Sequence, residues 1–306
     1  MPETSVGFIG TGIMGAPLVG HLLRGGCRVI VHSRTRTKAG PLLAQGATWA
    51  DSPAGAAAAV DVLFLMVTDT PDVEQVLFGQ DGAALALKRG SVVVDLSTIS
   101  PAGAREFSTR LAARGVAMLD APVTGGDIGA RNATLTIMVG GGAEALERVR
   151  PLLEMLGRRI VHVGPSGAGQ ALKACNQVLC AVNLMGVCEA LLLARSAGIS
   201  PGVVIDVLSA GAGGSWALAN YGPRMSAGDM APGFMVKLQQ KDLRIVQEAG
   251  QASGVPMPAT ALAQQLFRAV ESAAGGGDLG TQAMIMAYER LCVMAADPTR
   301  VTGMTA

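Results

Sequence analysis

Lys173 and Asn176 are the side chains of this sequence best placed for acid–base chemistry. They lie in the stretch GAGQALKACNQ, residues 167–177, directly before the apolar run VLCAVNLMGVCEALLLA. On a helix, residues three apart share a face, and Asn183, seven residues beyond Asn176, extends the same polar stripe. A lysine beside apolar surface is desolvated and gives up its proton more readily, and Asn176 would then orient it or hold a substrate. The alternative is a lysine near a helix start whose ammonium reaches water.

A second candidate is the glycine-rich segment VGFIGTGIMG, in which Gly10, Gly12 and Gly15 form the pattern G-x-G-x-x-G between a strand-like run and a helix-like one. Gly10 would permit a tight turn, Gly12 would let a pyrophosphate approach the backbone, and Gly15 would let the helix pack against the strand. We therefore predict a bound dinucleotide, although a glycine-rich turn without a ligand would read the same way. The predicted contacts are Gly10, Thr11, Gly12, Ile13, Met14 and Gly15.

The cofactor is predicted from the end of the second strand-like run, RVIVHSRTRTK. NAD-binding folds carry an acid there that bonds the ribose 2′-hydroxyl. This sequence has Ser33, Arg34 and Thr35 instead, with Arg36 and Lys38 close by. These donors suit a 2′-phosphate, so NADP (as NADPH) is favoured over NAD. The alternative is a solvated basic turn that accepts either cofactor.

The sequence also limits which group can give a proton to an alkoxide. Nicotinamide-dependent carbonyl reduction commonly uses His, Tyr with Lys, a metal-bound group, or Lys. Neither tyrosine begins the pattern YxxxK, and the three histidines have no close His, Cys or Asp partners for a metal. His162 lies in a predicted strand, where a structural histidine is more typical. Lys173 remains, and no metal is expected.

The elements that must position these residues change in kind near Gly164. Up to there, β-branched runs alternate with helical segments, and Ser52-Pro53, Thr70-Pro71 and Ser100-Pro101 each resemble an N-cap followed by a first helical proline. Seven strand-like runs are expected: VGFIG, RVIVHS, VLFLMVT, SVVVDLS, VAMLDAP, TLTIMVGG and RIVHVG.

Beyond Gly164 the strand-like runs stop. Helices are expected near residues 169–196, 201–209, 235–252, 258–274 and 281–295. The sequence thus predicts an α/β fold with two domains: an NADP-binding domain, residues 1–164, and an all-helical substrate and oligomerisation domain, residues 165–306.

Composition points to a small-molecule partner. Half of the 306 residues are apolar, and 24 Lys and Arg balance 23 Asp and Glu, without the basic clusters that nucleic acid or an anionic membrane would favour. Five dispersed cysteines and an N-terminus without a basic n-region indicate a reducing compartment, so cytoplasmic location is expected. The long apolar helix after Gln177 is interrupted by Asn183 and Glu189, so it does not read as a membrane span.

Five motifs together resemble the β-hydroxyacid dehydrogenase family, which includes 3-hydroxyisobutyrate dehydrogenase, tartronate semialdehyde reductase, and glyoxylate or succinic semialdehyde reductases. They are GFIGTGIMG, DLSTI at 95–99, DAPVTGGDIGA at 120–130, GAGQALKACNQ at 167–177 and KDL at 241–243. The resemblance covers residues 5 to about 295. It implies a Rossmann-type doubly wound sheet, then a helical domain, with the substrate held in a cleft between them.

The resemblance also implies roles for single residues. The family lysine that matches Lys173 is the proton donor, and the asparagine that matches Asn176 touches the substrate. The segment Val123, Thr124, Gly125 and Gly126 matches the one that holds the substrate carboxylate through backbone N–H groups, which form an anion nest.

Four further residues match cofactor contacts of the family. Thr98 would lie beside the nicotinamide ribose, Val67 and Thr68 would border the cofactor, and Lys241 would close on it. From the sequence alone, Thr98 would be a turn residue and Lys241 a solvated helix lysine.

The sequence departs from the family pattern at Thr124, where serine is commoner, at Ala133, where glycine is usual, and at Gln177, where many members have a second asparagine. Asn176-Gln177 is closer to the tartronate semialdehyde reductases, whereas Ser33-Arg34-Thr35 is closer to NADP-using glyoxylate and succinic semialdehyde reductases. The two signals disagree on the substrate.

The resulting hypothesis is an NADP-dependent reductase of a short carboxylate-bearing aldehyde, reversible as a 3-hydroxyacid dehydrogenase. The alternatives are an imine reductase, which Lys173 argues against, and a catalytically silent NADPH-binding module. The apolar helix near 170–194 needs more cover than one small domain offers, so a homodimer or homotetramer is expected, and a monomer by light scattering would contradict it.

Overall fold

The computed structural model describes residues 4–292, which form two compact units. Unit 1 comprises residues up to Gln177 together with Lys241–Pro256, and unit 2 comprises Val178–Gln240 and the residues from Met257 onward. The division falls inside two helices, so that Lys173, Asn176 and Lys241 all belong to unit 1.

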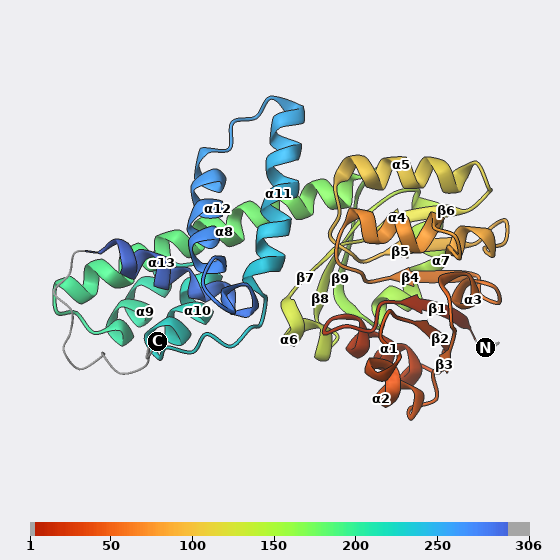
Figure 1. Ribbon diagram of the computed structural model, residues 1–306, viewed down its shortest axis with the longest axis horizontal. Coiled ribbons are helices and arrows are strands. Elements are labelled where there is room, and N and C mark those ends of the chain that lie inside the picture. Colours follow the sequence, from red (N-terminus) through yellow and green to blue (C-terminus); the bar gives the residue numbers. More distant parts are fainter. Residues whose placement is uncertain (1–3, 293–306) are drawn as a thin grey trace. The chain divides into compact units, whose positions relative to one another are not determined.

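Unit 1 contains one sheet, which has nine strands within the described residues (Figure 1). The strand order is β3-β2-β1-β4-β5-β6-β8-β7, with β9 paired to β8. The strands are β1 Ser5–Ile9, β2 Arg28–His32, β3 Thr48–Trp49, β4 Val62–Leu65, β5 Val92–Asp95, β6 Ala117–Asp120, β7 Val123–Thr124, β8 Leu135–Gly140 and β9 Gly157–Gly164. From β3 to β6 every pairing is parallel.

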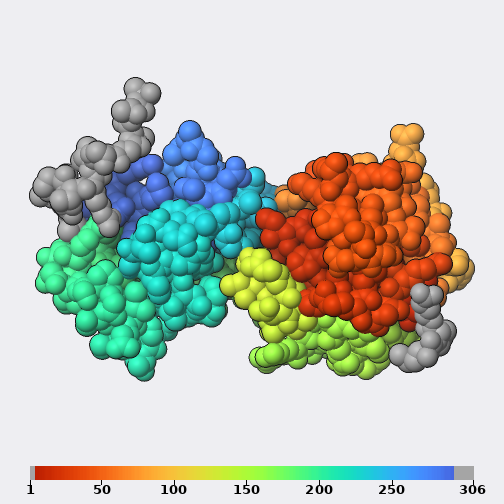
Figure 2. Space-filling view, turned by 90° about the horizontal axis from the view of Figure 1, so that it is seen from below, coloured from red at the N-terminus to blue at the C-terminus, as the bar shows by residue number. Residues whose placement is uncertain are grey.

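The helices of unit 1 cover both faces of this sheet. They are α1 Gly15–Arg24, α2 Gly40–Leu43, α3 Pro53–Ala57, α4 Thr70–Phe78, α5 Pro101–Ala112, α6 Gly126–Arg131 and α7 Ala143–Glu154, with 3-10 turns at Arg36–Ala39 and Ala83–Leu85. Figure 2 shows the first βα units, red to orange, packed side by side as one continuous surface.

Alternation along the buried strands builds two apolar cores. Val6, Phe8 and Phe64 point to the face covered by α1, α2 and α7. Their neighbours Ile9 and Leu63 point to the face covered by α3, α4 and α5. Such strands, buried on both sides, are typical of parallel sheets. The predicted α/β class with a doubly wound sheet is confirmed.

Unit 2 is helical. It contains most of α8 Ala168–Ser196, then α9 Pro201–Ser209, α10 Trp216–Ser226, the first residues of α11 Val236–Ser253, α12 Pro258–Glu271 and α13 Met284–Leu291. Two 3-10 turns, Gly276–Asp278 and Thr281–Ala283, precede α13. Phe267 and Met284 are fully buried in this unit.

Among the elements that the sequence analysis did not predict are the two-residue strands β3 and β7, and α10. Helix α10 contains Gly222 and Pro223, which read as a helix end, yet Ser215 caps it by accepting a hydrogen bond from the backbone N–H of Leu218 at 3.0 Å. The last residues of the helix expected near 281–295 lie outside the described residues.

One predicted helix start is shifted by a residue. Thr70 is the first residue of α4 and not its N-cap; the N-cap is Asp69, whose carboxylate accepts from the Thr70 N–H at 2.7 Å. Ser52 and Ser100 cap α3 and α5 as predicted.

Helix α8 is the one described helix whose length and composition would allow it to cross a membrane, and half of its most apolar window is buried in the protein. A long apolar core helix has the same properties, and this one begins against the sheet of unit 1.

Candidate active site

The glycine-rich turn between β1 and α1 has the form that a dinucleotide requires. Gly10 has φ of 103°, and a side chain there would collide with the backbone oxygen of Met66. A side chain at Gly15 would collide with the backbone oxygen of Gly10, whereas one at Gly12 would meet no atom within 4 Å. Gly10 therefore permits the tight turn, and Gly15 permits α1 to pack closely against that turn. Gly12 leaves its backbone accessible to a ligand.

Two polar features of this turn fit the pyrophosphate of the cofactor. The hydroxyl of Thr11 is buried and has no hydrogen-bond partner among the described residues. No side chain caps the N-terminus of α1, whose N-cap residue is Met14. Uncapped N–H groups at a helix start favour an anion. Ile13 is exposed beside them.

Beyond β2, the three residues predicted to select NADP lie at the surface. Arg34 is 83% exposed, and its guanidinium is 3.5 Å from the carboxylate of Asp72 in α4. Such an exposed ion pair is weak. Ser33 and Thr35 flank Arg34 without a carboxylate at the end of the strand.

The loops after β4 and β5 form one hydrogen-bonded rim at the carboxyl edge of the sheet. The backbone N–H of Val67 donates to Ser97 Oγ at 2.9 Å, and the N–H of Ser100 donates to Thr70 Oγ1 at 3.0 Å. The predicted cofactor residues Val67, Thr68 and Thr98 lie on this rim, at the edge where doubly wound sheets bind ligands.

Helix α8 is anchored to the same rim by Asp120, the last residue of β6. Its carboxylate accepts hydrogen bonds from the N–H groups of Gly167 at 2.7 Å and Gln170 at 2.9 Å. The Gln170 side chain, 1% exposed, accepts from the Ile99 N–H at 3.1 Å and donates to the Ser97 carbonyl at 2.7 Å. These bonds hold the turn around Thr98 at a set position relative to the start of α8.

Lys173 follows Gln170 by three residues on α8 and is buried, with 8% of its surface exposed. The structure therefore does not support the alternative of a lysine that extends to water. Asn176 is half-buried, and its Nδ2 donates to Gln177 Oε1 at 2.8 Å. Asn183, by contrast, is exposed. The polar stripe that was predicted from Lys173 through Asn176 to Asn183 is therefore not buried along its whole length.

The segment predicted to hold a carboxylate begins three residues after Asp120. Val123 and Thr124 form β7, which pairs antiparallel with β8. Gly125 and Gly126 follow with φ of 128° and 63°, values that glycine adopts without strain, and both are exposed. The two glycines thus leave their backbone accessible at the position where the family resemblance implies an anion nest.

Helix α11 brings Lys241 to the cofactor rim. Its Nζ donates to the Thr98 carbonyl at 2.6 Å, and one turn later Arg244 pairs with Asp69 at 2.6 Å. One basic side chain of α11 thus contacts the loop after β5, and the other contacts the loop after β4. The structure thus brings the two predicted cofactor residues Thr98 and Lys241 into direct contact.

Comparisons with known proteins agree with this arrangement. Residues 5–164 match the model of the NAD-binding domain of 6-phosphogluconate dehydrogenase, and residues 167–288 match the NAD-binding model of NADP-dependent 3-hydroxyisobutyrate dehydrogenase. The 2-hydroxy-3-oxopropionate reductase of Escherichia coli is 42% identical over 288 residues, which cover 93% of this chain and 97% of that protein.

Two other relatives are associated with L-serine. The NAD-dependent L-serine dehydrogenase of Pseudomonas aeruginosa is 42% identical over 86% of this chain and 91% of its own. A solved structure of Mycobacterium tuberculosis 3-hydroxyisobutyrate dehydrogenase with L-serine has a TM-score of 0.86 at 34% identity, covering 94% of this chain and 99% of that one. The chain belongs to the β-hydroxyacid dehydrogenase family. It is an NAD(P)-binding oxidoreductase of the hydroxyacid dehydrogenase type, acting on CH–OH groups.

In this dehydrogenase, sequence reasoning missed the residues that hold the candidate site in place. Asp120 and Gln170 fasten α8, and Arg244 fastens α11. Asp120 could have been noticed because it is an acid at the end of a buried strand, and a buried carboxylate needs hydrogen-bond donors nearby. Gln170 and Arg244 gave no signal, because their partners lie 71 and 175 residues away in the sequence.

The histidines of the dehydrogenase have structural partners. His21, His32 and His162 are hydrogen-bonded to the backbone oxygens of Ala130, Ala50 and Gly141, at 2.9, 2.9 and 2.8 Å. Within the described residues, no group of three or more His, Cys, Asp or Glu side chains could hold a metal ion.

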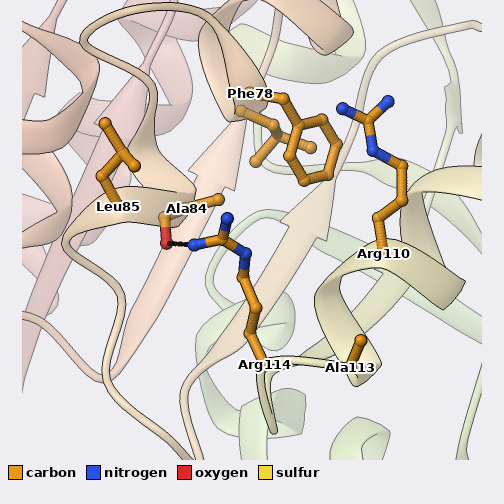
Figure 3. A pocket seen from close by; sticks show the side chains of 7 residues that line it. Phe78, Ala84, Leu85, Arg110, Ala113 and Arg114 are labelled. Atoms are coloured by element: carbon orange, nitrogen blue, oxygen red, sulfur yellow. Dashed lines mark hydrogen bonds between the residues drawn. The ribbon is translucent and has the colours of Figure 1, made fainter.

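A hollow of about 340 Å³ lies at the C-terminal ends of α4 and α5, away from the candidate site (Figure 3). Its guanidinium groups already have partners: Arg110 lies over the Phe78 ring, 3.7 Å from its centroid, and Arg114 donates to the Ala84 carbonyl at 3.0 Å. The lining residues are Leu77, Phe78, Ala84, Leu85, Arg110, Ala113 and Arg114. None of them is a predicted site residue.

Proposed function

We propose that this dehydrogenase reduces a short carboxylate-bearing aldehyde with NADPH and runs in reverse as a 3-hydroxyacid dehydrogenase. The substrate would be of the tartronate semialdehyde, glyoxylate or succinic semialdehyde type. The observation that carries the proposal is the buried Lys173, held one helical turn beyond the point where Gln170 joins α8 to the loop of Thr98. A buried ammonium is costly and is retained where it has a partner or a task.

The cofactor would be held by the residues of the glycine-rich turn and the rim. The N–H groups of the turn from Thr11 to Gly15 would bind its pyrophosphate, and Val67, Thr68, Thr98 and Lys241 would border its nicotinamide half. When bound, a reduced nicotinamide supplies a hydride to the carbonyl carbon of the substrate.

Lys173 would supply the proton that balances this step. As the C=O π bond opens, the Nζ ammonium gives one proton to the carbonyl oxygen, which becomes the hydroxyl, and the lysine is left neutral until it is reprotonated. Asn176 would hold the reacting part of the substrate. The N–H groups of residues 123–126, with the Thr124 hydroxyl, would bind its carboxylate. In reverse, neutral Lys173 would take the proton from the hydroxyacid.

The preference for NADPH rests on Ser33, Arg34 and Thr35. Arg34 is free to leave its weak pair with Asp72, because a 2′-phosphate offers a stronger, charge-assisted partner. The residue that would prefer NAD, an acid at position 33, is replaced by serine.

The cellular setting is also part of the proposal. The five cysteines are free thiols, as suits a cytoplasmic protein. Apolar side chains of α8 remain exposed, Leu179 and Leu193 among them, and a homodimer or homotetramer would cover them.

The test of the proposal is the initial rate of NADPH and, separately, NADH oxidation with four aldehyde acids: glyoxylate, tartronate semialdehyde, succinic semialdehyde and methylmalonate semialdehyde. We expect one of them to be turned over well, with NADPH preferred by about tenfold or more. A cyclic imine serves as the control substrate. Turnover of the imine alone, or no turnover while NADPH binds, would contradict the proposal.

A further inference from the structure

Asp242 lies next to Lys241 in α11 and is buried, with 2% of its surface exposed. Its two carboxylate oxygens have different partners. Oδ1 forms an ion pair with the Nζ of Lys241 at 2.7 Å, and Oδ2 accepts a hydrogen bond from Gln177 Nε2 at 2.5 Å. The sequence analysis singled out the KDL motif for its lysine alone and gave Asp242 no role.

The two partners lead to opposite parts of the candidate site. Lys241 continues to the cofactor rim, where its Nζ donates to the Thr98 carbonyl at 2.6 Å. Gln177 continues to the substrate side, where its Oε1 accepts from Asn176 Nδ2 at 2.8 Å. Asp242 is therefore the junction of a chain of contacts that runs from Thr98 to Asn176.

The charge of Asp242 determines the orientation of both amides on the substrate side. An ionised carboxylate only accepts hydrogen bonds, so the NH₂ group of Gln177 must face it. The carbonyl oxygen of Gln177 then faces Asn176 and fixes the Asn176 amide with its NH₂ group toward Gln177. On the cofactor side the same negative charge holds the Lys241 ammonium where it reaches the Thr98 carbonyl.

We infer that Asp242 is a positioning residue that couples the cofactor contact Lys241 to the substrate contact Asn176, acting on the latter through Gln177. The inference rests on the proposed function. The length of Gln177 matters here: it stands where many family members have asparagine, and its extra methylene group spans the distance to Asp242.

The test compares three variants with the wild-type enzyme: Asp242→Asn, Gln177→Leu and Lys241→Met. Asparagine keeps the size of Asp242 but places an NH₂ group or a neutral oxygen against an ammonium. Leucine approximates the shape of glutamine without its polar atoms. The matched control is Asp206→Asn, the same substitution at an exposed position of α9. The readouts are the NADPH dissociation constant by fluorescence, KM and kcat with the best aldehyde acid, and Tm.

Each single variant should give a distinct pattern. Lys241→Met should weaken NADPH binding about tenfold with little change in the aldehyde KM. Gln177→Leu should raise that KM or lower kcat about tenfold with NADPH binding unchanged. Asp242→Asn should do both. In the double variant that carries both Asp242→Asn and Lys241→Met, the NADPH dissociation constant should equal that of Lys241→Met alone, because the two side chains act as one unit. Asp206→Asn should match the wild type.

A purely structural Asp242 would give a different result. If Asp242→Asn lowers Tm while NADPH affinity, KM and kcat stay at wild-type values, the inference is overturned. If the wild type binds NADPH but turns over no aldehyde acid or hydroxyacid, the proposed function fails. The inference about Asp242 is then tested by the NADPH dissociation constants alone. In that case, unchanged NADPH affinity in Asp242→Asn overturns it.

Discussion

At the scale of single residues, the most unusual group is Asp95 at the end of β5. It is fully buried; its Oδ1 accepts from the Ser97 N–H at 3.0 Å, and its Oδ2 has no hydrogen-bond partner among the described residues. Burial raises the pKa of Asp95 to about 7, against the hydrogen bonds from Ser97, and the nearby Asp120 raises it further. The carboxyl group of Asp95 is therefore mostly protonated in the fold at mildly acidic pH and loses its proton near neutral pH.

The raised pKa makes stability depend on pH in a defined direction. Between the unfolded pKa near 4 and the folded pKa of about 7, the native state binds the proton that the unfolded state has lost. The contribution of Asp95 is full below that window and is lost as the pH rises through it. The free energy of unfolding of Asp95→Asn, which imitates the protonated acid, should therefore rise relative to that of the wild type by about 3 kcal/mol between roughly pH 5 and pH 8.

The measurement for Asp95 is the free energy of unfolding in urea for both proteins at several pH values, compared as a difference so that shared titrations cancel. A difference that stays flat, or that favours the wild type as the pH rises, would mean that the carboxyl is ionised in the fold.

Single residues also show where prediction from sequence stopped. The glycines were predicted from their spacing and Lys173 by elimination, whereas Thr98 came only from the family resemblance. Asp95 and Asp242 were not predicted, because the burial of Asp95 and the contact of Asp242 with Gln177 both depend on other elements. Ala133, noted only as a departure from the family glycine, has φ of 53°, so glycine is usual there for a conformational reason.

At the scale of elements, the start of α8 determines where Lys173 lies. Gly169 is packed so closely that a methyl group would collide with the backbone oxygens of Met138 and Asp120. Gly186, two-thirds of the way along the same helix, is exposed, and a methyl group there would meet nothing within 4 Å. The two glycines therefore have opposite consequences when replaced.

Gly169→Ala should destabilise the protein by about 1–3 kcal/mol and lower kcat, because α8 must move away from the sheet and take Lys173 with it. Gly186→Ala should stabilise it by about 0.5–1 kcal/mol through helix propensity, with kcat unchanged. Urea unfolding and initial rates of the two variants test this. A shift of the same sign in both would show that the start of α8 is not held as the structure has it.

Helices and strands were predicted well where the apolar residues repeat with a single helical or strand period. The seven long strands and the long helices followed from alternating and amphipathic patterns. The strand β7 has two residues, too few for a pattern, and it exists because β8 provides a partner edge. Helix α10 was missed because its Gly222-Pro223 pair reads as a break, whereas tertiary packing retains the helix through it.

At the scale of the whole molecule, the order of motifs along the chain was enough to recognise the family. The substrate was not predictable, because relatives about 40% identical are named for different ones, 2-hydroxy-3-oxopropionate and L-serine among them. Substrate choice depends on the shape of a pocket assembled from distant residues, and a sequence pattern does not encode those distances.

In the proposed function, Lys173 transfers the proton in an NADPH-dependent reduction. The measurement that tests it most directly is kcat together with the NADPH dissociation constant of Lys173→Ala, with Lys237→Ala, an exposed lysine paired to Asp278, as the control. We expect kcat to fall about 100- to 10,000-fold in Lys173→Ala while NADPH binding is retained, and we expect wild-type values for the control. A Lys173→Ala enzyme that keeps most of its kcat would contradict it.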